Sequence, residues 1–214
     1  MGKIKNIIFD LGGVLIDIKR EAAAEALEEL GITEADHLLD DYEQKGIFLL
    51  LEEGQISAAE LYDSLLPLCK PHTTCTDIRN AFEKFLVGLP VERLKTIDRL
   101  REAGYKMYVL SNTNSIFYDV WIANAFRADG KSINDYFDGI VTSFQEQACK
   151  PNPKIFTNLL NRYALKPEET IFLDDSKANC ATGESLGLHT VTIAQEGDTS
   201  FNRVTERLLK ESRN

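Results

Sequence analysis

The stretch K-N-I-I-F-D-L-G-G-V-L at residues 5–15 constrains the fold of this chain more than any other. Its apolar residues 7–9 form a short run that is typical of a buried parallel strand. The run stops at Asp10, and Gly12 and Gly13 then allow a sharp turn and a close approach of the backbone to a ligand. A carboxylate at the C-terminal end of a buried strand lies where open α/β sheets bind ligands. From this stretch alone, a helix cap explains Asp10 equally well.

Beyond residue 90, segments with strand character alternate with segments with helical character. Strands are expected at residues 107–110, 139–143, 170–173 and 189–193, and helices at 91–103, 116–126, 153–163, 178–186 and 201–210. Such alternation implies right-handed crossover connections and therefore a parallel sheet with helices packed on it. With the strand at residues 7–9, the sequence predicts an α/β fold with a sheet of about five parallel strands.

Residues 18–88 interrupt this pattern and are expected to form a small helical insert after the first strand. We find no convincing strand there, only short helices predicted at residues 20–30, 33–44, 58–68 and 77–86. Gly31 is the expected end of the first of these helices, and Ser57 is the expected N-cap of the third. The chain then divides into a core of residues 1–17 and 89–214 and an insert of residues 18–88.

Polar residues follow the predicted strands at the points where the strands end. Asp10 follows the first strand, Ser111 the second and the pair Asp174-Asp175 the fourth, while Lys150 lies shortly after the third. Each of them alone could be a turn residue or a solvated side chain. Because the carboxyl ends of parallel strands share one edge, we expect these side chains to converge on one crevice.

Phosphoryl transfer is the chemistry that this set of side chains fits. Crowded carboxylates repel one another and need a cation, and oxygen ligands favour a hard one such as Mg²⁺. The cation would let a substrate phosphate approach Asp10, which could then attack phosphorus and form an aspartyl-phosphate. Ser111 could donate its hydroxyl to a phosphoryl oxygen, and Lys150 could neutralise developing negative charge.

The chain resembles the haloacid dehalogenase-like (HAD) hydrolase superfamily. Four motifs carry the resemblance in order: F-D-L-G-G-V-L with Asp10, V-L-S-N-T-N with Ser111, C-K-P-N-P-K-I-F with Lys150, and F-L-D-D-S-K-A-N with Asp174, Asp175 and Asn179. The resemblance implies a Rossmann-like core with a mobile cap, and the insert matches the C1-type cap that follows the first motif. Within it, L-E-E-G-Q-I-S-A-A-E-L at residues 51–61 is similar to the cap segment of sugar-phosphatase-like members.

The resemblance also implies roles for individual residues. Catalysis falls to Asp10, Ser111 and Lys150, and substrate binding to Ser111, Asn112 and Lys150. It implies that Mg²⁺ is held by Asp10, the Gly12 carbonyl and Asp175, with Asp174 beside them and with Ser176 and Asn179 orienting the carboxylates. In the cap, we expect residues 42–53 to face the substrate, with Tyr42 and Lys45 as binding residues and Phe48 more simply explained as core.

Gly12 departs from the pattern of this family. Phosphatases of the family usually carry an aspartate there, whose carbonyl binds Mg²⁺ and whose carboxyl protonates the leaving group. Gly12 keeps the carbonyl but lacks the carboxyl, and such acid–base help is typically worth about 10²–10⁴-fold in rate. Members resembling bacterial α-glucose-1-phosphate phosphatase share the D-L-G start. We therefore expect sugar 1-phosphates, which have activated leaving groups, to be favoured, with Asp17 a weak candidate for positioning water.

The composition of the chain limits the classes of partner that it is expected to bind and the compartment in which it is expected to occur. The 214 residues carry a net charge of −10, which argues against nucleic acid and anionic membranes but not against a small phosphorylated metabolite. The four cysteines match no zinc pattern and are interpreted as free thiols in a reducing compartment, which favours a cytoplasmic location. The oligomeric state stays open.

Two other functions compete with a Mg²⁺-dependent phosphatase. One is a binding or regulatory module on a catalytically weakened scaffold, since fold does not fix function. The other is metal-free carbon–halogen hydrolysis. The Asp174-Asp175 pair argues against the second, because a site without a cation has little use for additional carboxylates.

Overall fold

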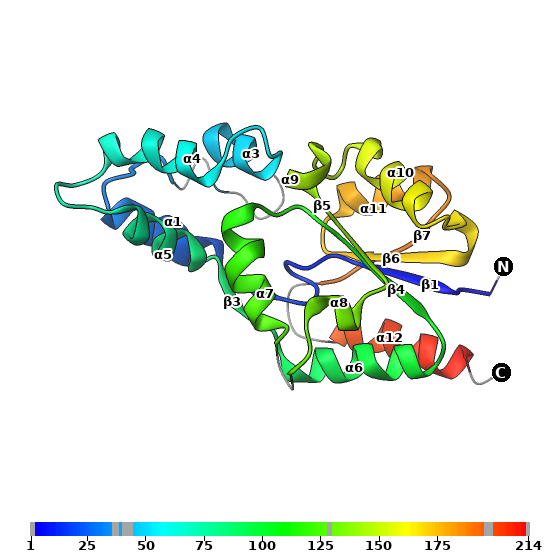
Figure 1. The fold of residues 1–214 in the computed structure, drawn as a ribbon. Coiled ribbons are helices and arrows are strands. Elements are labelled where there is room, and N and C mark those ends of the chain that lie inside the picture. Colours follow the sequence, from blue (N-terminus) through cyan, green and yellow to red (C-terminus); the bar gives the residue numbers. More distant parts are fainter. Residues whose placement is uncertain (1–2, 36–38, 40–44, 128–129, 195–198, 213–214) are drawn as a thin grey trace.

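The structure is a computed structural model that describes residues 3–35, 39, 45–127, 130–194 and 199–212. Within these residues the centre of the fold is a five-stranded sheet with the order β5-β4-β1-β6-β7 (Figure 1). Its strands are β1 (Asn6–Phe9), β4 (Lys106–Ser111), β5 (Gly139–Thr142), β6 (Thr170–Asp174) and β7 (His189–Thr192). All neighbouring strands pair in parallel, so their carboxyl ends share one edge. The predicted α/β fold with about five parallel strands is confirmed.

The middle strand, β1, is buried on both faces, which explains why its apolar residues are contiguous. Ile7 and Phe9 belong to one hydrophobic core and Ile8 to the other, and each of the three is at most 1% exposed. The strand pairs with β4 on one side and β6 on the other. Asp10, the next residue, therefore emerges at the middle of the carboxyl edge.

Helices cover both faces of the sheet, as Figure 1 shows. One face is covered by α6 (Val91–Glu102) and α12 (Thr199–Glu211), and the other by α10 (Pro153–Arg162) and α11 (Lys177–Ser185). Each helix turns an apolar stripe toward the strands, as Leu94, Ile97 and Leu100 do in α6. These four helices agree with the predicted ones to within two residues at either end.

Shorter elements differ more from the sequence-based expectations. The predicted helix at 116–126 consists of a π-helix, η2 (Phe117–Ile122), followed by α7 (Ala123–Ala125). Two four-residue helices, α8 (Ile133–Tyr136) and α9 (Ser143–Glu146), and the 3₁₀ turn η4 (Pro167–Glu169) were not expected. Elements of one turn are too short to show a hydrophobic period, so the sequence pattern gives no signal for them.

The insert contains α1 (Arg20–Glu29), α3 (Gly46–Glu52), α4 (Ala58–Leu65), the 3₁₀ turn η1 (Leu66–Leu68) and α5 (Cys75–Glu83). Ser57 caps α4 in a capping box with Glu60, which confirms its predicted role. The expectation of no strand between residues 18 and 88 was wrong, because β2 (Asp17–Ile18) pairs antiparallel with β3 (Leu86–Gly88). Strands of two and three residues cannot show alternation. The helix predicted at 33–44 falls largely outside the described residues.

Aromatic rings connect the insert to the rest of the molecule. The ring of Phe82 in α5 lies between those of Phe48 in α3, 5.0 Å away, and Phe117 in η2, 4.5 Å away, measured between centroids. All three rings are buried, and such tilted contacts add stabilisation beyond the buried apolar area. Phe48 is therefore a core residue, which confirms the simpler of its two interpretations.

No helix in the described part of the chain is long and apolar enough to span a membrane. All four cysteines are free thiols in this structure. Burial raises the pKa of the Cys180 and Cys149 thiols, so both are held in the protonated form.

Candidate active site

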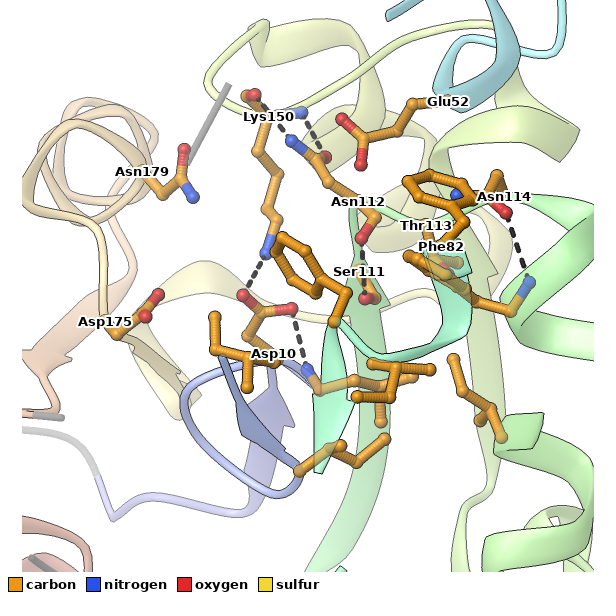
Figure 2. A pocket seen from close by; sticks show the side chains of 18 residues that line it. Asp10, Glu52, Phe82, Ser111, Asn112, Thr113, Asn114, Lys150, Asp175 and Asn179 are labelled. Atoms are coloured by element: carbon orange, nitrogen blue, oxygen red, sulfur yellow. Dashed lines mark hydrogen bonds and ion pairs between the residues drawn. The ribbon is translucent and has the colours of Figure 1, made fainter. Parts of the chain in front are cut away.

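A pocket lies at the carboxyl edge of the sheet, between the strand ends and the insert (Figure 2). Polar side chains at or after the ends of β1, β4, β5 and β6 form one side of it, and apolar side chains of the insert and of η2 form much of the other. The residues on the polar side include Asp10, Ser111, Asn112, Lys150, Asp175 and Asn179. The structure thus brings together the side chains that the strand ends were predicted to contribute.

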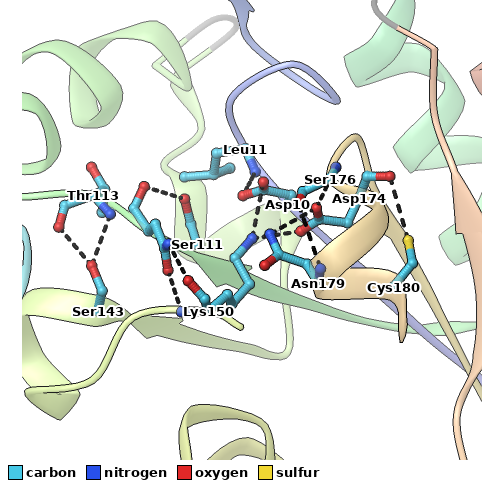
Figure 3. A network of polar contacts seen from close by, with 11 residues as sticks. Asp10, Leu11, Ser111, Thr113, Ser143, Lys150, Asp174, Ser176, Asn179 and Cys180 are labelled. Atoms are coloured by element: carbon cyan, nitrogen blue, oxygen red, sulfur yellow. Dashed lines mark hydrogen bonds and ion pairs between the residues drawn. The ribbon is translucent and has the colours of Figure 1, made fainter. Parts of the chain in front are cut away.

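Lys150 lies between two of the carboxylates (Figure 3). Its Nζ is 2.9 Å from Oδ2 of Asp10 and 2.6 Å from Oδ2 of Asp174, and its side chain is 1% exposed. Burial alone would lower the pKa of Lys150, but the two carboxylates outweigh burial and raise the pKa above its usual range. The ammonium group is therefore a permanent positive charge in the pocket.

Asp10 is the carboxylate at the middle of the edge. Its Oδ1 accepts a hydrogen bond from the backbone N–H of Leu11 at 2.7 Å. Burial raises the pKa of Asp10 well above its usual range, Asp174 and Asp175 raise it further by repulsion, and Lys150 opposes the rise. One lysine thus does not fully offset the crowding of these carboxylates.

The carboxylates of Asp10, Asp174 and Asp175 have the arrangement of a metal site. One oxygen from each lies within 4.8 Å of the others. Carboxylate oxygens at this spacing fit a hard cation such as Mg²⁺, which is usually bound by one or two carboxylates together with substrate oxygens and water.

The two neighbouring aspartates are held differently. Asp174 is fully buried, and its Oδ1 accepts hydrogen bonds from the Ser176 backbone at 2.8 Å and from Nδ2 of Asn179 at 3.0 Å. Asp175 lines the pocket instead. A Cβ on Gly13, where φ is +69°, would lie 2.0 Å from Oδ2 of Asp175. Gly13 therefore has to be glycine for the carboxylate of Asp175 to occupy its place.

Asn112, which directly follows β4 in the motif V-L-S-N-T-N, holds the backbone of Lys150 in place. Oδ1 of Asn112 accepts a hydrogen bond from the backbone N–H of Lys150 at 2.7 Å, and Nδ2 of Asn112 donates to the carbonyl of Lys150 at 2.9 Å. Asn112 thus positions Lys150, and its predicted role in substrate binding stays a prediction. Ser111 is 1% exposed and lines the pocket beside it, and its predicted contact with phosphate stays a prediction.

Of the two cap residues predicted to contact substrate, the structure describes only one, and that one does not line the pocket. Tyr42 lies outside the described residues, and Lys45 is an exposed residue at the start of α3 that does not line the pocket. Glu52, at the other end of α3, does line it. Asp17 is half exposed and forms an ion pair with Arg93 at 2.8 Å, outside the pocket lining, so it is no candidate for positioning water.

Thr113 and Glu52 line the pocket, although the sequence did not single out either of them. Thr113 lies in the second motif, but nothing in the sequence distinguishes it from a turn residue. Its backbone is fixed by Ser143, whose Oγ accepts from the Thr113 N–H at 2.9 Å and donates to the Thr113 carbonyl at 2.8 Å. Glu52 lies within the range 42–53 that was expected to face the substrate and in the segment that resembles sugar-phosphatase caps, but no signal distinguished it within that range.

A family model for haloacid dehalogenase-like hydrolases matches residues 4–187. The chain belongs to this family. One curated relative of this chain is D-ribitol-5-phosphate phosphatase from Bacteroides thetaiotaomicron. The two are 40% identical over 187 residues, which cover 87% of this chain and 90% of the relative. The resemblance found in the four motifs is thereby confirmed.

Solved structures of HAD enzymes agree with the fold. A HAD family enzyme from Bacteroides thetaiotaomicron, in complex with magnesium and inorganic phosphate, is 35% identical with a TM-score of 0.85, and the match covers 92% of this chain and 98% of that one. A HAD-like hydrolase from Porphyromonas gingivalis is 35% identical with a TM-score of 0.87 over 98% and 99% of the two chains. L-2-haloacid dehalogenase from Xanthobacter autotrophicus, at 18% identity, a TM-score of 0.60 and coverage of 94% and 81%, shares the fold.

Proposed function

We propose that this HAD hydrolase is a Mg²⁺-dependent phosphatase of small phosphorylated metabolites, in particular phosphorylated sugars and polyols. The observation that carries the proposal is the buried cluster in which Lys150 contacts Asp10 and Asp174 while Asp175 faces the pocket. The activity of the ribitol-phosphate phosphatase and the magnesium and phosphate bound to the related HAD enzyme support it.

Asp10 is the proposed nucleophile. One of its oxygens bonds to phosphorus while the bond from phosphorus to the leaving oxygen breaks, and the released alkoxide takes up a proton. Water then attacks the phosphorus of the aspartyl-phosphate, which breaks the bond to Asp10, releases inorganic phosphate and restores the carboxylate. Asp10, the carbonyl of Gly12 and Asp175 would hold Mg²⁺, whose charge lets an anionic phosphate approach the carboxylates.

The remaining residues of the cluster supply fixed charge and hydrogen bonds. The buried ammonium of Lys150 stabilises negative charge that develops on the phosphoryl oxygens, and burial strengthens its effect. Ser111 donates its hydroxyl to one of those oxygens. Asp174, held by Ser176 and Asn179, keeps Lys150 in place, and it would support the metal site beside Asp175, as the family resemblance implies.

Residues 18–88 are the proposed cap. The short β2–β3 ribbon lies where the chain leaves and rejoins the core, and Ile18, Glu52 and Phe82 of this segment line the pocket. A segment attached through so narrow a base can move relative to the sheet and admit substrate. The cytoplasmic location and the exclusion of nucleic acid, both inferred from composition, stay predictions.

Hydrolysis assays with and without metal test the proposed function. We expect release of phosphate from sugar and polyol phosphates in Mg²⁺, loss of that activity in EDTA, and no activity in Asp10→Asn at either condition. Binding of phosphate esters without turnover would favour the regulatory-module alternative. Metal-independent release of halide from a haloacid would favour dehalogenation instead.

A further inference from the structure

We propose that Glu52 and Thr113 form a subsite that binds hydroxyl groups of the substrate. The substrate is then a phosphate monoester whose organic part is uncharged and carries several hydroxyl groups. This inference rests on the proposed phosphatase function. It concerns the part of the substrate that would contact both the insert and the core. Glu52 comes from the end of α3 in the insert, and Thr113 from the loop that follows β4 in the core. Both line the pocket that contains Asp10.

Glu52 is a buried carboxylate on the wall of the pocket. Its side chain is on the insert side, and in Figure 2 it lies near Asn112 and away from Asp175. The residue is 7% exposed, so its carboxylate belongs to the wall of the pocket and not to the outer surface. A carboxylate accepts hydrogen bonds and does not donate them, so it suits hydroxyl groups of a ligand and repels a second anionic group.

The packing of the insert on the core fixes the position of Glu52. Gly54, two residues further on, lies so close to α9 that a Cβ would be 2.0 Å from the carbonyl oxygen of Phe144. Its φ of +64° is also one that glycine adopts readily. In addition, Sγ of Cys149 lies 3.9 Å from Oε2 of Glu52. The end of α3 therefore rests on the core, and the depth of Glu52 in the pocket is set by that contact.

Thr113 offers a second polar group. Its residue is 3% exposed, and its Oγ1 has no hydrogen-bond partner among the protein atoms that the structure describes. Because Ser143 holds the backbone of Thr113 on both sides, the hydroxyl cannot easily move away. A buried hydroxyl without a partner costs free energy, so a ligand hydroxyl that bonds to it is favoured.

Apolar rings complete the subsite. Phe82, Phe85 and Phe117 line the same pocket, and Phe85 and Phe117 are stacked with centroids 5.9 Å apart. A sugar or polyol chain presents C–H groups on one side and hydroxyls on another, which matches a wall of rings beside a carboxylate and a hydroxyl. A phosphorylated carboxylic acid matches poorly, since its carboxylate would approach Glu52.

The test uses two substrates with the same kind of leaving oxygen. D-ribitol 5-phosphate carries hydroxyls, whereas n-pentyl phosphate has a similar chain without them. We expect Glu52→Gln and Thr113→Val each to lower kcat/KM for D-ribitol 5-phosphate about 10- to 100-fold, as expected for a lost hydrogen bond to a charged or buried group, and to leave n-pentyl phosphate within about threefold. Glu53→Gln is the matched control, because Glu53 does not line the pocket.

A gain of function supplies a readout that misfolding cannot imitate. Glu52→Gln should raise kcat/KM for phosphoglycolate above the wild-type value, because the repelling charge is removed. An equal loss for D-ribitol 5-phosphate and n-pentyl phosphate would overturn the inference and identify Glu52 as a proton donor. So would unchanged kinetics in both variants. If wild type hydrolyses p-nitrophenyl phosphate with Mg²⁺ yet shows no preference for hydroxylated esters, this inference fails while the proposed function stands.

Discussion

The side-chain amide of Asn112 brackets the backbone of Lys150, accepting from its N–H at 2.7 Å and donating to its carbonyl at 2.9 Å. The loop after β4 thereby sets the position of a residue that lies 38 positions further along the chain. The ammonium group of Lys150 in turn bridges Asp10 and Asp174, so the backbone and side chain of one lysine together connect the ends of β4, β1 and β6. The geometry of the site depends on these contacts as much as on the carboxylates.

The first prediction concerns Asn112. Asn112→Ala removes both hydrogen bonds and lets Lys150 shift, and a misplacement of about 1 Å can cost about 10²-fold in rate. We expect kcat and kcat/KM to fall together, because Lys150 acts on charge that develops in the transition state. Steady-state kinetics check this. A rise in KM at constant kcat would show that Asn112 binds the substrate instead.

The second prediction concerns the charge of Lys150. Lys150→Met keeps much of the side-chain volume but leaves the buried carboxylates without their ammonium partner. Breaking a buried ion pair in this way typically costs about 3–5 kcal/mol of unfolding free energy. In EDTA we expect the free energy of unfolding of Lys150→Met to fall by that amount. Adding Mg²⁺ should raise the free energy of unfolding of the variant more than that of wild type, because the cation replaces part of the missing charge.

Chemical denaturation with and without Mg²⁺ measures both effects. Lys154→Met is the control, since Lys154 belongs to the same motif and is exposed. Equal stabilisation by Mg²⁺ in wild type and Lys150→Met would contradict the view that the lysine and the metal act on the same carboxylates.

The third prediction compares two adjacent glycines. A Cβ on Gly13 would lie 2.0 Å from the carboxylate of Asp175, whereas a Cβ on Gly12 would meet only Cγ2 of Ile18 at 3.5 Å. Gly13→Ala should therefore displace Asp175 and raise the Mg²⁺ concentration needed for half-maximal activity, and Gly12→Ala should change it little. Titration of activity against Mg²⁺ provides the measurement. Similar values for the two variants would argue against Asp175 as a metal ligand.

The fourth prediction concerns the missing acid at Gly12. Because the space beside Gly12 accepts a Cβ and its φ lies outside the left-handed region, Gly12→Asp should fold. We expect it to raise kcat for sugar 6-phosphates more than for sugar 1-phosphates, by up to about 10²–10⁴-fold, since an acid helps poor leaving groups most. In wild type the 1-phosphate of a given sugar should be hydrolysed faster than its 6-phosphate. A wild-type preference for the 6-phosphate would mean that another group supplies the proton.

The centre of the site could be predicted because its aspartates and Ser111 stand at the ends of recognisable apolar runs. Asp10 and Asp174 follow such runs directly, and the parallel pattern places their strands at one edge. The role of Asn112 could not be predicted, because its partner is a backbone that approaches only in the folded chain. The strands β2 and β3 could not be predicted, because two and three residues are too few to show an alternating pattern.

The cap side of the pocket was much harder to predict. Glu52 and Glu53 are adjacent and chemically alike, yet Glu52 is buried in the pocket and Glu53 is only half buried. Which of them faces the substrate depends on how α3 rests on α9, and no local pattern records that contact. Lys45, at the opposite end of the same helix, was the sequence-based choice and is exposed to solvent.

Trapping the phosphorylated enzyme shows whether Asp10 is the nucleophile. We predict that acid quenching during turnover of a sugar phosphate in Mg²⁺ yields protein heavier by one phosphoryl group, with the added mass on the peptide that contains Asp10. The missing acid–base group at Gly12 should slow the second step and help this species to accumulate. Asp10→Asn, quenched under the same conditions, should carry no added mass. Rapid Mg²⁺-dependent turnover by Asp10→Asn, or a phosphoryl group on another residue, would contradict the account.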